Sequence, residues 1–411
     1  MTNSIQKTIL NNGLTVISET IPTVRSISLG IWIKAGSRHE TKNNNGIAHF
    51  LEHMVFKGTE HRSALKIARS MEEMGGSLNA YTSKELTVYY THSLDSHLSK
   101  SVNILADLVC HPLFRQKDID KEKRVVLEEI SAVKDTPDEY IIDIFQEKLF
   151  PEQSLGYPIL GTEETVTNFD RKQLIDFWSK LYCPRNMVLS AAGNLDHEKL
   201  IALIEKKFIF QNNCHAVKII PPKPAHHVRL ELKEAVNQSH ICVGLDGLSY
   251  LDEDRYLLLA LNSYLGGGMS SRLFQVIREK YGLAYTVYSF VDFFRDTGIF
   301  SFYMGTERTK HQQAIDLLFS EIEKLINKPI KATTAHRLRE QLKGNYLLGL
   351  ESTHRRMTRL AKNEIYYKRQ IALDEIIKKK INPINPNSLL EIARKIFIID
   401  HFNIIQLNPN A

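Results

Sequence analysis

Residues 46–58, GIAHFLEHMVFKG, show helical periodicity between two glycines and contain the order HxxEH. His49 and His53 are four positions apart, so one helical face presents both imidazoles to a single point. Glu52 lies about 60° round the helix from His49, near enough to reach a water bound to a metal there. This reversed HExxH order predicts a metal site. The alternative is a surface helix with two solvated histidines and a glutamate.

A second helix is predicted near residues 118–134, and two carboxylates lie on the face that should be buried. At about 100° per residue, one stripe collects Ile119, Glu122, Val125, Val126, Glu129, Ile130 and Val133. An unpaired carboxylate is costly to bury, so Glu122 and Glu129 each need a partner, such as a metal or a ligating histidine. Pairing with arginines or lysines of a neighbouring helix is the alternative.

Two histidines and one glutamate are a recurrent ligand set for catalytic zinc, which keeps a further position for water. Bound zinc lowers the pKa of that water toward neutrality, and a glutamate base takes its proton as hydroxide attacks a peptide carbonyl. The residues therefore predict a zinc-dependent peptide hydrolase in which Glu52 is the base.

The segment HFLEHMVFKGT at 49–59, followed by VVLEE at 125–129, resembles the pitrilysin family of inverzincin zinc metallopeptidases. The similarity is greatest to its mitochondrial-processing-peptidase-like branch of short bacterial and organellar chains. The third zinc ligand of the family lies 76 positions after the second histidine and corresponds to Glu129. The assisting glutamate, seven positions earlier, corresponds to Glu122. The resemblance implies an endopeptidase with one zinc ion per chain.

The same resemblance implies substrate-binding residues in the first half of the chain. Asn79 and Ala80 match an edge strand that pairs with an extended peptide by strand addition, although an ordinary hairpin strand fits them too. Phe56 matches an apolar wall for the residue after the scissile bond. Glu139 and Asp143 match acidic positions that hold an arginine before that bond, although an acidic pair at i, i+4 is commonly a solvated helix face.

In the second half, GGGMSSRLFQVIREKYGLAYTVYS at 266–289 resembles the family's C-terminal segment. Its arginine and tyrosine correspond to Arg278 and Tyr285, which in relatives hold the substrate and the reacting carbonyl. Without the resemblance these would be a routine helix charge and a strand aromatic. The glycine-rich loop used for presequence binding in the mitochondrial enzyme is reduced here to three glycines, which argues against presequence specificity.

The chain of 411 residues is too long for one hydrophobic core, which predicts two domains. The stretch 211–227 contains three prolines among polar residues and predicts a linker between residues 1–210 and residues 228–411. Beyond the linker the order of strands and helices restarts, which indicates a divergent duplication. Asn262 and Ser263 stand where the first copy has the motif glutamate and second histidine, so the second copy lacks the metal ligands.

The predicted fold class is α+β, with two homologous α/β domains, each a mostly antiparallel sheet covered by helices. Strands are predicted for the hairpin around Asn12 and Gly13 and for the alternating segment from Ile27 to Ile33. A non-catalytic structural or core subunit of the same fold is the alternative function, because relatives of that kind have lost the metal residues.

Composition excludes several other classes of protein. The net charge is +6, but basic and acidic residues are interleaved, so no nucleic-acid partner is expected. No run approaches the ~20 apolar residues of a membrane span, and no leader pattern opens the chain. Cys110, Cys183, Cys214 and Cys242 are scattered, which predicts no disulfide framework and favours the cytoplasm.

The expected partners are extended peptide substrates and a second copy of the chain. Relatives of double length place the zinc domain opposite a second half that supplies the arginine and the tyrosine. This chain has the length of one half but carries both the zinc motif and that pair, which predicts a homodimer with composite sites. A monomer that uses its own two domains is the alternative.

Overall fold

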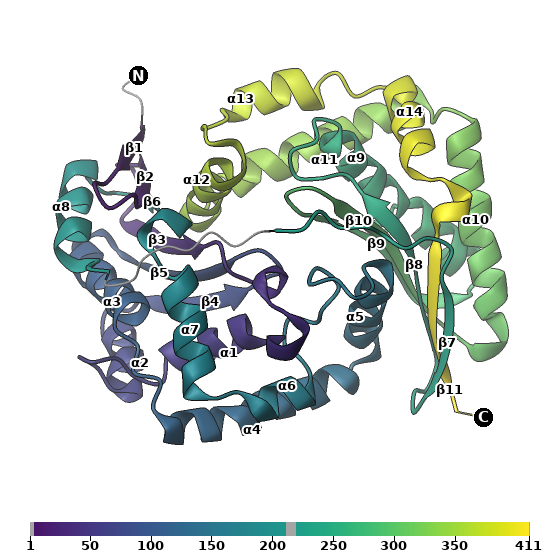
Figure 1. Cartoon of the computed structure of the whole chain (residues 1–411). Coiled ribbons are helices and arrows are strands. Elements are labelled where there is room, and N and C mark those ends of the chain that lie inside the picture. Colours follow the sequence, from purple (N-terminus) through teal and green to yellow (C-terminus); the bar gives the residue numbers. More distant parts are fainter. Residues whose placement is uncertain (1–3, 211–218, 411) are drawn as a thin grey trace. The chain divides into compact units, whose positions relative to one another are not determined.

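The computed structural model describes residues 4–210 and 219–410, which form two separate β-sheets with their own helices (Figure 1). Unit 1 comprises Met1–Ser131, Tyr157–Ile220 and Leu348–Gln370, and unit 2 comprises Ala132–Gly156, Pro221–Leu347 and Ile371–Ala411. Both sheets are mixed and covered by helices, which confirms the predicted α+β class.

The sheet of unit 1 has the strand order β1-β2-β6-β3-β5-β4. Its strands are β1 (Ile5–Ile9), β2 (Thr15–Thr20), β3 (Ser26–Ile33), β4 (Ser77–Thr82), β5 (Thr87–Leu94) and β6 (Met187–Gly193). Only the β2–β6 pair is parallel. The hairpin predicted around Asn12 and Gly13 is confirmed as β1–β2, and the alternating segment forms β3.

The sheet of unit 2 has the strand order β7-β11-β8-β10-β9. Its strands are β7 (Arg229–Glu234), β8 (Ser239–Gly247), β9 (Ala284–Phe293), β10 (Gly298–Thr306) and β11 (Asn403–Pro409). The first and last strands of the unit pair in parallel, as β2 and β6 do in unit 1. With β1 set aside, the two sheets have the same order of strands along the chain and in space, which supports the duplication.

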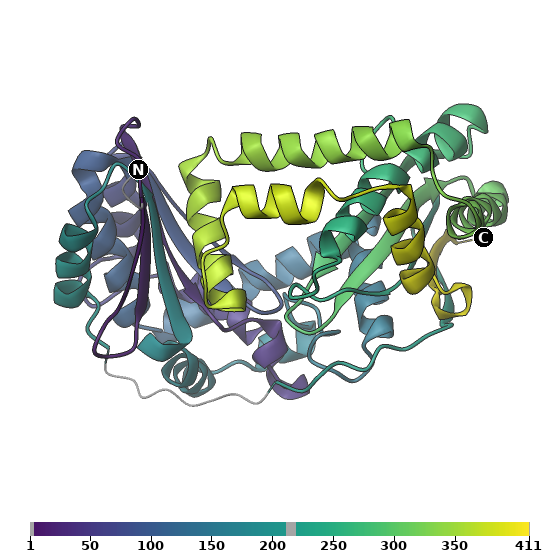
Figure 2. The same cartoon turned by 90° about the horizontal axis from the view of Figure 1, so that it is seen from above.

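The helices cover both faces of the unit 1 sheet. Alternate residues of β3 face opposite sides: Ile31 packs with the main core cluster, which includes residues of α3, and Trp32 packs with Met357 of α12. Figure 2 shows this sheet nearly edge-on between the two helical layers. The helices of unit 1 are α1 (Ile47–Val55), α2 (Ala64–Glu72), α3 (Leu98–Cys110), most of α4 (Gln116–Lys134), α6 (Glu163–Asn168), α7 (Arg171–Leu181), α8 (His197–Lys207) and α12 (Thr353–Tyr367).

Unit 2 contains the remaining α-helices and, among its described residues, π-helices at Phe274–Lys280 and Ile377–Ile381. The α-helices are α5 (Pro137–Leu149), α9 (Arg255–Leu265), α10 (His311–Asn327), nearly all of α11 (Ala332–Gly349), α13 (Leu373–Ile376) and α14 (Pro386–Ile396). No helix in the described residues is both long enough and apolar enough to span a bilayer.

The compact units do not follow the predicted boundaries 1–210 and 228–411, because one helix of each half belongs to the other unit. Helix α5 buries Ile141 and Phe145 against Ile405 of the unit 2 sheet. Helix α12 buries Met357 and Leu360 in the unit 1 cluster that contains Trp32. Periodicity identifies an apolar helix face but not the sheet that it covers.

Two further expectations concern the linker and the cysteines. Residues 211–218 of the predicted linker lie outside the described residues, and residues 219–227 form neither helix nor strand. Cys110 and Cys242 are free and buried. Cys183 is disulfide-bonded, a bond that the scattered spacing of the cysteines did not predict.

Candidate active site

Helix α1 presents the HxxEH side chains because its other face is buried. Phe50, Leu51 and Met54 are inaccessible to solvent and belong to the main core cluster of unit 1. The rotation of the helix is therefore fixed by burial, and His49 and His53 are left half-buried on the remaining face. The predicted helix and the placement of both histidines on one face are confirmed.

Buried Glu40 holds the N-terminus of α1. Its carboxylate accepts hydrogen bonds from the backbone N–H groups of Gly46, at 2.7 Å, and Ala48, at 2.8 Å. These groups have no partner inside the helix, so the carboxylate satisfies them and complements the helix dipole. Gly46 has a φ of +92°, and a Cβ there would lie 2.6 Å from the carbonyl oxygen of Leu160. Nothing in the local sequence indicated the role of Glu40, which lies six residues before the glycine.

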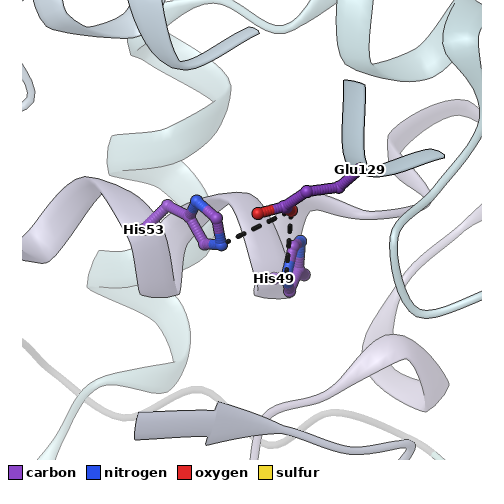
Figure 3. Close-up of side chains that lie close together, drawn as sticks. All are labelled: His49, His53 and Glu129. Atoms are coloured by element: carbon purple, nitrogen blue, oxygen red, sulfur yellow. Dashed lines mark ion pairs between the residues drawn. The ribbon is translucent and has the colours of Figure 1, made fainter. Parts of the chain in front are cut away.

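The three predicted metal ligands meet in unit 1. Glu129 Oε2 of α4 lies 3.9 Å from His49 Nε2 and 3.7 Å from His53 Nε2. Figure 3 shows the Glu129 carboxylate directed at both imidazole rings. Zinc with bonds of roughly 2.1 Å in tetrahedral geometry separates its ligand atoms by about 3.4 Å, so the observed spacing is a few tenths of an ångström wider.

The donor atoms also have the chemistry of a zinc site. Glu129 Oε2 is buried and has no hydrogen-bond partner among the described residues, an arrangement that is costly unless a cation is bound. Burial lowers the pKa of His49 to about 3, so its imidazole is neutral at physiological pH and can donate a lone pair. The residues present therefore fit a zinc ion held by His49, His53 and Glu129.

Glu122 orients His53 from the side opposite the metal position. Its Oε1 lies 2.8 Å from His53 Nδ1, and its Oε2 lies 2.6 Å from Lys57 Nζ. Because an ionised carboxylate only accepts, Nδ1 carries the proton and Nε2 is free to bind a metal. Burial alone would raise the pKa of Glu122, but the hydrogen bonds from His53 and Lys57 lower it. Glu122 therefore has both of the partners considered from the sequence, a ligating histidine and a lysine.

Zinc binding is expected to release more than half a proton per chain at pH 6.5. Burial lowers the pKa of His53, but the hydrogen bond to Glu122 and the charges of Glu129, Glu122 and Glu52 outweigh it and raise the pKa above 6.5. His53 must therefore lose its Nε2 proton to bind metal, and the apparent affinity falls as the pH drops through this raised pKa. Calorimetric titration in buffers of different ionisation enthalpy measures the protons released.

Glu122→Gln provides the control, since it removes the charge that raises the pKa of His53 and keeps the size of the side chain. Fewer protons should be released at the same pH, and zinc affinity should fall by about 10- to 100-fold. Equal proton release by Glu122→Gln and the unaltered chain would contradict this assignment.

Glu52 lies beside the three ligand residues and is held by Thr82 at the end of β4. Thr82 Oγ1 donates a hydrogen bond to Glu52 Oε2 at 2.5 Å. The other carboxylate oxygen of Glu52, Oε1, takes no part in this hydrogen bond. Burial raises the pKa of Glu52. Burial is also the main cause that raises the pKa values of Tyr89 and Tyr182, and the nearby charge of Glu52 adds to it. A carboxylate with a raised pKa suits a general base. Thr82 lies in the predicted edge-strand segment, and nothing in the sequence marks it as a partner of Glu52.

The predicted buried stripe of α4 is confirmed in part. Ile119, Glu122, Val126 and Ile130 are buried, Glu129 and Val133 are half-buried, and Val125 is 43% exposed. Spacings of three and four residues define a narrower stripe than the predicted one.

The predicted substrate-binding residues of unit 1 differ in how far they are exposed to solvent. Asn79 and Ala80 lie on β4, which pairs only with β5 and is an edge of the sheet. Asn79 is exposed, and Ala80 packs against the core. The ring of Phe56 lies 6.1 Å from that of Tyr89, so Phe56 contributes to the core at least in part.

The structure brings Arg278 and Tyr285 together in unit 2. The Arg278 guanidinium lies 4.9 Å from the centroid of the Tyr285 ring, and Tyr285 is 78% exposed at the start of β9. β9 is one of the two edge strands of this sheet. Glu139 and Asp143 lie on α5, within the same unit.

Comparisons with known proteins agree with the fold. Residues 15–163 match the model described as insulinase (peptidase family M16), and residues 168–342 match the one described as peptidase M16 inactive domain. The "Uncharacterized zinc protease YmxG" of Bacillus subtilis is 40% identical over 97% of this chain and 97% of its own. An "Uncharacterized zinc protease" of Rickettsia felis is 36% identical over 94% of each chain.

A solved structure has the same fold at low sequence identity. The protease from Helicobacter pylori superposes with a TM-score of 0.93 at 23% identity, and the match covers 98% of this chain and 99% of that one. The putative M16-like peptidase from Alicyclobacillus acidocaldarius gives a TM-score of 0.87 at 21% identity, covering 99% of this chain and 98% of that one. At this identity the likeness shows the fold alone.

The fold is that of the M16 peptidases, and the relatives given above are named zinc proteases. The chain belongs to the insulinase family, peptidase family M16, which confirms the pitrilysin-family resemblance. The first family match contains His49, His53 and Glu129, and the second, described as inactive, covers a part without an HxxEH motif.

Proposed function

We propose that the chain is a zinc-dependent endopeptidase that hydrolyses unfolded or extended peptides with one zinc ion per chain. The observation that carries the proposal is the buried Glu129 Oε2, which has no hydrogen-bond partner among the described residues and faces the Nε2 atoms of His49 and His53 at 3.9 and 3.7 Å. A non-catalytic core subunit would not need this set of donors, nor a carboxylate such as Glu52 beside it.

In this proposal, zinc supplies Lewis-acid activation of the attacking water and of the peptide carbonyl. Glu52 takes the proton of the water with the carboxylate oxygen that Thr82 does not occupy, and then gives a proton to the departing amine. Glu122 keeps His53 in the tautomer that offers Nε2. The buried surroundings of Glu52 strengthen these electrostatic effects because they exclude water.

Cleavage of an unbiased peptide library, mapped by mass spectrometry with and without chelator, tests the function. The cuts should disappear with chelator and return when zinc is restored. Internal cuts in extended peptides support an endopeptidase, and the absence of any zinc-dependent cut would favour the core-subunit alternative.

Substrate binding is proposed to use two edge features. The free edge of β4 at Asn79 and Ala80 can pair with an extended peptide backbone, as in other sheets that bind peptides by strand addition. Arg278 and Tyr285, which lie beside each other in unit 2, offer a cation and a phenol to peptide carbonyls. Phe56 is proposed as an apolar wall, although part of its ring is committed to the core.

A preference for arginine upstream of the cleaved bond is proposed to come from Glu139 and Asp143. The Glu139→Ala, Asp143→Ala double variant should lose most of any arginine enrichment upstream of the cuts, since an exposed ion pair contributes about 0.2–1 kcal/mol and two such contacts change preference several-fold. The same peptide library measures it. Glu147→Ala is a matched control, because this exposed glutamate lies on the same helix. Unchanged cleavage sites in the double variant would refute the assignment.

The active unit is proposed to be a homodimer in which each site takes Arg278 and Tyr285 from the second copy. Mixing inactive Glu52→Gln chains with inactive Arg278→Ala, Tyr285→Ala chains should restore about a quarter of the activity. Half of the dimers are then mixed, and each mixed dimer has one intact site of two. Activity is measured after subunit exchange confirmed by native mass spectrometry. A mixture that stays inactive while mixed dimers form indicates sites built within one chain.

A further inference from the structure

A second cluster of potential metal ligands lies in unit 2, at one end of its sheet. Its members are His226 before β7, Asp246 near the end of β8, and His401 of the short helix Ile399–His401 before β11. One ligand atom from each side chain lies within 4.8 Å of the other two. His226 and His401 are 175 positions apart in the sequence, so no local motif predicts that these residues meet.

Strand register explains why these residues meet. β11 pairs in parallel with β7, with Ile404 opposite Arg229, and antiparallel with β8, with Asn403 opposite Gly244. Three residues before the Ile404–Arg229 pair, the same parallel register sets His401 opposite His226. Two residues beyond the Asn403–Gly244 pair, the antiparallel register sets His401 opposite Asp246. The cluster is therefore a row across three adjacent strand ends.

The distances and chemistry in this row suit a transition metal. His226 Nε2 lies 3.5 Å from Asp246 Oδ1, close to the roughly 3.4 Å between ligand atoms of tetrahedral zinc, and the two imidazole centroids are 4.0 Å apart. Within the described residues, none of the three side chains has a hydrogen-bond partner. The side chains of His226 and Asp246 are 31% and 33% exposed, so an ion could enter from solvent.

The backbone around His226 is anchored, so the row is not a chance approach of mobile side chains. Buried Asn403 donates from Nδ2 to the carbonyl of Ala225 and accepts the N–H of Val228 at Oδ1, each at 2.8 Å. The two bonds bracket His226 on both sides. The next residue, His227, has a φ of +60°, which turns the chain between the bracketing bonds.

We propose that His226, Asp246 and His401 form a second binding site for zinc or a similar divalent transition metal, separate from the centre at His49, His53 and Glu129. Two imidazoles and one carboxylate are suited to zinc, nickel and cobalt, with water filling the open positions. An ion there joins the end of the connecting segment to two strands of the unit 2 sheet, which stabilises the folded state because the unfolded chain does not hold the three donors together. The site does not depend on peptidase activity.

Metal content tests the proposal directly. After loading with zinc and removal of excess ion, native mass spectrometry should find one ion fewer per chain in Asp246→Asn and in His401→Ala than in the unaltered chain. Asp246→Asn keeps the shape of a partly exposed strand residue and should fold normally. His227→Asn is the matched control, because asparagine tolerates the positive φ and the variant loses an imidazole of the same segment. It should keep the full metal content.

A second measurement isolates this site from the first. In a His49→Ala, His53→Ala background, cobalt titration followed by visible absorption should show one ion per chain. The ion should raise the melting temperature by roughly 5 °C at saturating concentration. Adding Asp246→Asn should weaken this binding by more than about 100-fold and remove the shift. Equal metal content in Asp246→Asn and the unaltered chain, or no cobalt bound in the background variant, would overturn the proposal.

Discussion

Glu52→Gln is expected to lower peptide hydrolysis by about 10³-fold while zinc content stays at that of the unaltered chain. Glutamine has the size of glutamate but cannot take a proton from water, and Glu52 is not among the three grouped donors. The hydrogen bond from Thr82 can be kept by the amide oxygen, so the local packing is preserved. A quenched-peptide assay and metal analysis of the same sample measure both quantities.

Thr82→Val is the companion variant, because it removes the hydrogen bond to Glu52 and keeps the base. A loss of about tenfold or less is expected, since one positioning contact contributes roughly 1 kcal/mol. Near-normal turnover by Glu52→Gln would refute the assignment of Glu52 as the general base. Loss of zinc from Glu52→Gln would show that its carboxylate belongs to the ligand set.

His53→Ala and Glu129→Gln are each expected to bring zinc below about a tenth of an ion per chain at the active centre and to abolish hydrolysis. Catalytic zinc is held by three protein ligands, so removing one leaves two and a much weaker site. His53→Ala also leaves buried Glu122 with Lys57 as its remaining charged partner among the described residues, and we expect a loss of stability of about 1–3 kcal/mol. Equilibrium dialysis against buffered zinc and thermal unfolding measure these effects.

His336→Ala controls for the removal of an imidazole, because this exposed histidine lies on α11 and in neither metal cluster. Its zinc content and activity should be unchanged. Full zinc occupancy of the active centre in His53→Ala would refute the ligand assignment. So would recovery of activity by His53→Ala at zinc concentrations near those that saturate the unaltered chain.

The sequence by itself determined the helix of the HxxEH segment, the strands around it and the pair of glutamates on α4. Each of these rests on a local period, because apolar residues at helical or alternate spacing are buried whatever the partner. The periodicity of α4 placed both Glu122 and Glu129 on one face but did not distinguish them. The family resemblance assigned Glu129 as ligand and Glu122 as helper, and the distances to His53 and His49 agree with that assignment.

Only the tertiary structure decided which partners those faces meet. Lys57 reaches Glu122, Thr82 reaches Glu52 and Glu40 caps α1 through contacts that no local period encodes. The same holds for α5 and α12, whose apolar faces cover sheets formed mainly by the other half of the chain. The row of His226, Asp246 and His401 depends on register between strands far apart in sequence. Such pairings depend on global packing and strand register, whereas local periodicity reports only that a face is apolar.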